Sequence, residues 1–150
     1  MPQSPARLHI HLVFSTKHRE RNITDAVRES LHAYMATVLN NFRCHTVLIN
    51  SADDHVHLLF ELGRTIAISE AVEEVKTTSS KWIKTQGPGF RSFAWQGGYA
   101  AFAVDMSSIV HVRDYVANQR EHHRVETFQD EYRRFLAENG VEFDERYMWD

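Results

Sequence analysis

Two histidines, His55 and His57, stand two residues apart in a stretch with β-strand character. Because successive side chains of a strand point to opposite faces, both imidazoles are expected on one face, with Val56 and Leu58 on the other. Imidazole nitrogens bind several divalent transition ions, and the two aspartates before His55 can supply oxygen ligands or accept from the ring N–H groups. The spacing therefore indicates a candidate metal site, although it also fits a polar strand face without a metal.

A tyrosine and a glutamine form a second pair at functional spacing. Tyr115 and Gln119 are four residues apart in a segment of helical periodicity, so they are expected to share a face. There the amide oxygen could reach a cation beside the phenol, whereas the alternative is a packed aromatic ring with a solvated hydroxyl. His9 and His11 repeat the spacing of the histidine pair, and we interpret them as the solvent-facing side of their own strand.

The surrounding elements follow from periodicity. Alternation predicts strands over 7–15, 43–50, 55–62 and 100–104, and helical spacing predicts helices over 24–40, 68–85, 107–119 and 127–138. This order predicts an α+β fold with a ferredoxin-like or RRM-like antiparallel sheet, helices packed on one face, and C-terminal helices in addition. We expect a catalytic domain over 1–124, with 125–150 as a helical tail packed on or extending it.

Composition limits the classes of protein. With 150 residues, 43% of them hydrophobic, the chain fits one domain. Its single cysteine, Cys44, excludes an internal disulfide and a cysteine-rich zinc site. We find neither an apolar run of about 20 residues nor a secretion signal, and we expect a soluble intracellular protein.

Charge is distributed unevenly along the chain. The net charge is −3, but residues 1–120 hold 13 basic and 11 acidic residues, whereas residues 121–150 hold 4 and 9. Two basic clusters in the first part, which also fit ordinary solvated faces, could follow DNA phosphates. They consist of Lys17, Arg19 and Arg21, and of Lys76, Lys81 and Lys84.

Five stretches together resemble a known family. They are HLVFSTKHR (11–19), DDHVHLLFEL (53–62), VKTTSSKWI (75–83), WQGGYAAFAV (95–104) and VRDYVANQREHHR (112–124). In this order they resemble the single-tyrosine transposases of bacterial insertion sequences, including the REP-associated tyrosine transposases, which belong to the HUH endonucleases (histidine, hydrophobic residue, histidine). The resemblance is specific, since a His-Val-His strand, a Lys-x-x-Ser-Ser helix, a Trp-x-Gly-Gly-Tyr turn and a Tyr-x-x-x-Gln helix must coincide.

The resemblance implies a metal-dependent DNA strand-transferase. His55, His57 and Gln119 would hold Mg²⁺ or Mn²⁺, and Tyr115 would attack a DNA phosphate to give a 5′-phosphotyrosine and a free 3′-OH. A phenol of pKa about 10 is mostly protonated at neutral pH, and a cation that polarises the phosphoryl group assists it. The ester conserves the bond energy, so that rejoining needs no nucleotide cofactor.

The resemblance also implies partners. The family suggests a homodimer in which the tyrosine helix of one subunit can complete the histidine site of the other, and a substrate of single-stranded DNA with hairpin ends. No membrane partner is expected, and the place of action would be the nucleoid in the bacterial cytoplasm. Our candidates for contacts with the DNA backbone are Lys17, Arg19, Lys76, Lys81, Lys84 and Arg120.

Two other functions remain as alternatives. One is a catalytically inactive, domesticated relative that binds DNA hairpins, which the acidic tail favours. The other is a histidine-rich metal hydrolase unrelated to DNA, which does not account for Tyr115 together with Gln119.

Overall fold

The computed structural model describes residues 3–119, 121 and 125–149. Its strands and longer helices are β1 (His9–Ser15), α1 (Asp25–Asn41), β2 (His45–Ser51), β3 (His55–Glu61), α2 (Ile68–Lys84), β4 (Ala100–Val104), α3 (Ile109–Ala117) and α5 (Phe128–Glu138). Short 3-10 turns lie at η1 (Lys17–Arg19), η2 (Pro88–Phe90) and η3 (Met106–Ser108). No helix of the described residues is both long and apolar enough to cross a membrane.

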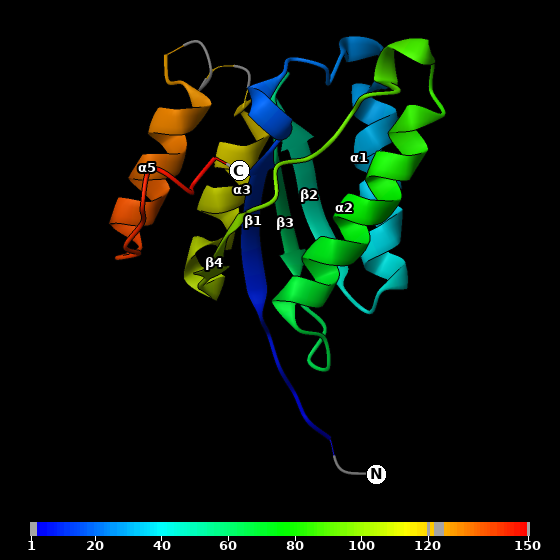
Figure 1. The fold of residues 1–150 in the computed structure, drawn as a ribbon. Coiled ribbons are helices and arrows are strands. Elements are labelled where there is room, and N and C mark those ends of the chain that lie inside the picture. Colours follow the sequence, from blue (N-terminus) through cyan, green and yellow to red (C-terminus); the bar gives the residue numbers. More distant parts are fainter. Residues whose placement is uncertain (1–2, 120, 122–124, 150) are drawn as a thin grey trace.

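The four strands form one antiparallel sheet in the order β2-β3-β1-β4. β1 is central and pairs Val13 with His57 of β3 on one side and with Ala100 of β4 on the other. This is the ferredoxin-like arrangement expected from the sequence. Helices cover both faces: α1 and α2 lie on one, and α3 and α5 lie on the other (Figure 1).

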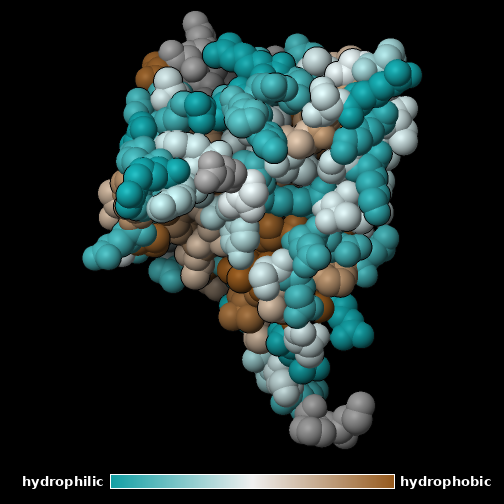
Figure 2. Space-filling model, in the orientation of Figure 1, coloured by the Kyte–Doolittle hydropathy of each residue, from teal (hydrophilic) through white to brown (hydrophobic). Residues whose placement is uncertain are grey.

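The main core lies between the sheet and the helices α1 and α2. The residues of β1 and β3 that point to this face alternate with those that point to the other, as the period of a strand requires. Fully buried members include Leu12, Phe14, Leu58, Phe60, Leu31, Met35 and Val75. Polar residues cover most of the outer surface seen in Figure 2, apart from an apolar area over the first half of β1.

A second, smaller core lies on the opposite face. It consists of Val13, Ala100, Phe102, Phe128, Tyr132 and Leu136. The last three occupy one stripe of α5 at intervals of four residues, which explains why this short helix docks on the sheet. Thr127 caps it, since the Thr127 hydroxyl oxygen accepts from the backbone N–H of Asp130.

The second core overturns one expectation. Our interpretation of His9 and His11 as solvent-facing was wrong, because their side chains are only 6% and 4% exposed. The ring of Phe135, from α5, lies 5.3 Å from that of His11 in an edge-on contact. The tail therefore covers His11 and Val13 on this face of β1, while His9 lies 3.9 Å from Glu61 of the neighbouring strand.

Candidate active site

The two histidines of β3 lie on the face of the sheet that α5 covers. His55 and His57 are both 0% exposed, and the intervening Val56 belongs to the main core on the other side. Antiparallel pairing with β1 fixes both positions in the sheet, because His55 stands opposite Ser15 and His57 opposite Val13. The sequence prediction that the two imidazoles share one face therefore agrees with the structure.

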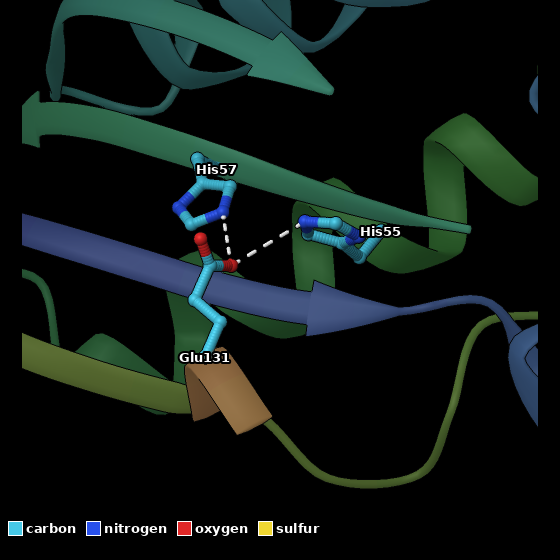
Figure 3. Close-up of side chains that lie close together, drawn as sticks. All are labelled: His55, His57 and Glu131. Atoms are coloured by element: carbon cyan, nitrogen blue, oxygen red, sulfur yellow. Dashed lines mark hydrogen bonds and ion pairs between the residues drawn. The ribbon is translucent and has the colours of Figure 1, made fainter. Parts of the chain in front are cut away.

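A glutamate from the tail joins the two histidines. Glu131, in the first turn of α5, extends toward them in Figure 3, and its Oε1 lies 2.9 Å from His57 Nε2 and 3.4 Å from His55 Nε2. One ligand atom from each of the three residues lies within 4.8 Å of the others, and Glu131 is also 0% exposed. Two imidazoles and one carboxylate form a donor set that can bind a divalent transition ion.

Further contacts orient each imidazole. His55 Nδ1 lies 2.7 Å from Asp54 Oδ1, and His57 Nδ1 lies 2.8 Å from His11 Nε2. In both rings Nδ1 is thereby engaged, and Nε2 faces Glu131. Outer contacts of this kind fix ring orientation in metal sites, so both rings are already directed at one point.

The buried charges of the group stabilise one another. Burial alone would raise the pKa of Glu131, but His57 and His55 lower it far below its ordinary value. Burial alone would lower the pKa of His55, but the carboxylates of Asp54 and Glu131 raise it. For His11, burial and the neighbouring His57 lower the pKa to about 3, so this imidazole is neutral at physiological pH.

Tyr115 reaches the same glutamate from α3. Its hydroxyl donates a hydrogen bond to Glu131 Oε2, and Arg134 Nη2 donates to the hydroxyl oxygen over 2.9 Å. Burial and the Glu131 carboxylate raise the pKa of Tyr115 well above its ordinary value, whereas Arg134 acts in the opposite direction. Histidines, glutamate and tyrosine thus meet within a single chain.

The end of α3 is fixed to the sheet edge. Asn50 of β2 donates through its side-chain amide to the carbonyls of Val116 and Ala117, over 2.9 and 3.1 Å. The last carbonyls of a helix lack partners within the helix, so these bonds both satisfy them and hold the helix against β2. The ring of Tyr115 is thereby held 6.0 Å from that of His57.

Gln119 does not lie on α3 as the sequence suggested. The helix ends at Ala117, and Gln119, which is 0% exposed, donates through Nε2 to the Tyr115 carbonyl over 3.3 Å. Glu131 was missed by the sequence reasoning, although a signal was present. It stands among Phe128, Tyr132 and Leu136 on the apolar stripe of α5, where an acidic residue is out of place unless it has a buried partner.

The predicted DNA contacts lie in different surroundings. Lys17 is exposed on η1. The residue before it, Thr16, donates its backbone N–H to the carbonyl of Asp54, which precedes His55. Lys81 and Lys84 are exposed on α2, across the sheet from the histidines. The guanidinium of Arg19 lies 5.7 Å from the ring of Trp149.

Lys76 differs from the other predicted cations. It is half-buried, and its ammonium donates to the carbonyls of Gln96 and Gly98 over 2.8 and 2.6 Å. Burial lowers the pKa of Lys76 to about 8. Arg120 lies outside the described residues.

Two cavities flank the buried group. One of about 460 Å³ lies beside Asp54 and Phe128, and it is also lined by Arg21, Asp25 and Arg28. The other, of about 310 Å³, lies between β4, α3 and α5, and Tyr115 forms part of its wall. The nucleophile candidate therefore borders an open space, whereas the three metal-ligand candidates are covered.

Comparisons with known proteins identify a family and a shared fold. A family model described as "Transposase IS200 like" matches residues 4–119. A candidate transposase from Deinococcus radiodurans R1 has a similar structure, with a TM-score of 0.62 and 21% identity over 79% of this chain and 98% of that one. A REP-associated tyrosine transposase, solved bound to a REP hairpin, has a TM-score of 0.59 and 12% identity over 82% of this chain and 74% of that one. No curated protein sequence is significantly similar.

Proposed function

The chain belongs to the family of IS200-like transposases, and from this premise we propose that it cleaves and rejoins single-stranded DNA with Tyr115 as the nucleophile. The resemblance found in the sequence is thereby confirmed at the level of the family. The observation that carries the proposal is that the Tyr115 hydroxyl meets Glu131, which in turn lies against both histidines.

His55, His57 and Glu131 are our proposed ligands for a divalent metal ion. They fit such an ion because three potential ligand atoms, two from β3 and one from α5, converge in a buried position. Mg²⁺ prefers oxygen ligands, whereas Mn²⁺ is a transition ion with a higher affinity for imidazole, so of the two ions implied by the resemblance this donor set favours Mn²⁺. Gln119, the ligand implied by the family resemblance, stays a further candidate. When bound, such an ion polarises the phosphoryl oxygens of the substrate.

The residues of the chain bind and orient the reacting groups. Tyr115 attacks the phosphorus, so that the bond from Oη to phosphorus forms while the bond from phosphorus to the 3′ oxygen breaks. The phenol loses its proton and the departing 3′ oxygen gains one, which balances the step. A later attack by a 3′-OH on the phosphotyrosine reverses these changes and joins two strands without an external energy source.

Tyr115 lies beside the histidines of its own chain, and this position concerns how the site is assembled in a dimer. The histidines, the glutamate and the tyrosine of one chain lie together, which supports a site completed within one subunit as our proposal. We propose DNA hairpins as the bound substrate, and a homodimer as the assembly suggested by the family. The proposed place of action is the bacterial nucleoid, and the exposed Lys17, Lys81 and Lys84 are proposed to contact phosphates.

One observation favours a second function. The hydroxyl of Tyr115 is held by Glu131 and Arg134, and His55 and His57 have no exposed surface. A relative that binds hairpins without cutting them would tolerate such an arrangement. The two functions differ chemically, because only the nuclease forms a covalent bond between tyrosine and DNA.

The test is the formation of that bond. We would incubate the protein with labelled single-stranded DNA from the flanks of its own gene, in MnCl₂, MgCl₂ or EDTA, and separate the products on a denaturing gel. We expect a metal-dependent covalent band that Tyr115→Phe abolishes and that Tyr147→Phe, at an exposed tyrosine, retains. Retardation on a native gel without any covalent band would favour the binding function, and undiminished cleavage by Tyr115→Phe would refute the nucleophile.

A further inference from the structure

The cavity between β4, α3 and α5 borders the proposed nucleophile but has no role in the reaction described so far. Its volume of about 310 Å³ is at the lower end of the roughly 300–1,000 Å³ typical of ligand pockets. Tyr115 and Arg134 line it at one side, and Phe102 and Phe135 supply aromatic walls. Ser108 and Asn139 add hydrogen-bonding groups.

We propose that this cavity is the subsite for the nucleotide whose 5′-phosphate becomes bonded to Tyr115, and that Arg134 binds that phosphate. The inference rests on the proposed function and deepens it, because it names a specificity-determining pocket of the same site. Arg134 and Phe135 belong to α5, which lies beyond the residues 4–119 matched by the family model. The subsite is therefore built partly from the tail of this chain.

The contact between Arg134 and Tyr115 locates the phosphate. Arg134 Nη2 already lies 2.9 Å from Tyr115 Oη, the atom that would bond to phosphorus. Any phosphate bonded to Oη places its non-bridging oxygens beside the same guanidinium, which favours charge-assisted hydrogen bonds. Glu126 and Glu138 also contact Arg134, at 2.8 and 3.6 Å, so the phosphate must compete with two partly exposed carboxylates.

The stereochemistry of phosphoryl transfer selects the nucleotide. The attacking and leaving oxygens lie roughly in line, so the departing 3′ oxygen is on the far side of phosphorus from Oη. The sugar attached through the 5′ oxygen instead lies to the side of this line. A pocket with the tyrosine in its wall therefore suits the nucleotide that stays attached to Tyr115.

The aromatic walls suit a base. Phe102 and Phe135 lie 5.9 Å apart between ring centroids, and the Arg134 guanidinium lies 4.9 Å from the ring of Phe135. Aromatic rings and arginine planes hold single-stranded bases by stacking, which depends little on sequence. His111 and Asp105, at the same cavity, can read the edge of the base.

Two matched pairs of variants test the subsite. Ser108→Trp fills the cavity. This change should not disturb α3, because the Ser108 side chain makes no capping hydrogen bond. The control is Ser107→Trp, which places the same ring at an exposed position one residue earlier. Arg134→Gln removes the phosphate contact, and Arg133→Gln is the matched change on the same helix, at an arginine that pairs with Asp130 and Glu145.

The first readout needs no cleavage. The probe is 2-aminopurine deoxyribonucleoside 5′-monophosphate, whose fluorescence falls when its base stacks. We expect saturable quenching by the wild type, Ser107→Trp and Arg133→Gln. Quenching should weaken at least tenfold in Ser108→Trp and Arg134→Gln, with partial recovery in Arg134→Lys. Absence of saturable quenching by the wild type, or equal quenching by Ser108→Trp, would overturn the subsite, whatever the outcome for covalent adducts.

The second readout uses the covalent adduct. A substrate that lacks the base at the nucleotide 3′ of the cut should react on the order of tenfold more slowly with the wild type, because one stacked base is lost. Ser108→Trp should react equally slowly with both substrates. Equal rates of the wild type on both substrates would refute the subsite while leaving the nuclease intact, whereas absence of any adduct would refute the nuclease.

Discussion

Glu131→Gln is the most specific test of the buried group of His55, His57 and Glu131, because it removes one negative charge and changes the side-chain shape very little. The carboxylate accepts from Tyr115, lies 2.9 Å from His57 Nε2, and has no exposed surface. Removing one partner of a buried ion pair costs about 3–5 kcal/mol, since the other charge stays buried. At about 2–4 °C per kcal/mol for a domain of this size, we expect the metal-free variant to unfold roughly 6–20 °C below the wild type.

The same substitution should remove the response to metal. An ion at about 100 times its Kd stabilises the folded protein by about 2.7 kcal/mol, which corresponds to roughly 5–11 °C. We expect MnCl₂ to raise the unfolding temperature of the wild type by this amount, and to have little effect on Glu131→Gln or His57→Ala. Circular dichroism during heating, with MnCl₂ or with EDTA, measures both effects.

A variant at Gln119 decides between the two proposed third ligands. Gln119→Ala should retain the MnCl₂ shift if Glu131 is the ligand, and should lose it if the ligand is the one implied by the family resemblance. Glu131 is not a metal ligand if Glu131→Gln keeps the full MnCl₂ shift. Glu131 forms no stabilising buried ion pair if the metal-free variant unfolds at the wild-type temperature.

Two further predictions concern acid stability and DNA binding. Burial and the neighbouring Arg28 lower the pKa of His32 from 6.5 to about 4. The unfolded chain therefore binds this proton first as the pH falls, and folded stability should drop by about 2–3 kcal/mol between pH 6.5 and pH 4. Urea unfolding of His32→Gln should show a correspondingly flatter pH dependence, and parallel curves would contradict this. The double variant Lys81→Gln, Lys84→Gln should reduce the slope of log binding constant against log salt by about 1.4 for single-stranded DNA. Lys76→Gln should instead lower stability with little change in this slope, because the Lys76 ammonium is bonded to two backbone carbonyls. Fluorescence anisotropy titrations at several salt concentrations measure the slopes. A reduced slope for Lys76→Gln and an unchanged slope for the double variant would contradict the prediction.

The sequence predicted those parts of the site that depend on local periodicity. Alternation in a strand was sufficient to place His55 and His57 on one face. Periodicity does not reveal what covers a face. His11 resembled a residue on a solvent-facing side of a strand because α5, whose Phe135 covers it, comes more than 100 residues later in the chain.

Other features could not be predicted because they too depend on contacts between residues far apart in the sequence. The helix carrying Tyr115 ends at Ala117, where Asn50 of β2 bonds to its last carbonyls, and that contact cannot be read from the sequence of the helix alone. Glu131 gave only an indirect signal, as a charged residue on an apolar stripe.

The division of the site between two stretches of chain has an evolutionary consequence. The main core joins the sheet to α1 and α2 without any contribution from α5, so the tail can change in sequence with little effect on the larger core. Yet the tail supplies Glu131 and Arg134, which surround the tyrosine hydroxyl. On the proposed assignment of Glu131 and Arg134, we therefore expect mutations after residue 124 to alter metal preference and the recognised nucleotide without any change to the His-Val-His strand and its sheet.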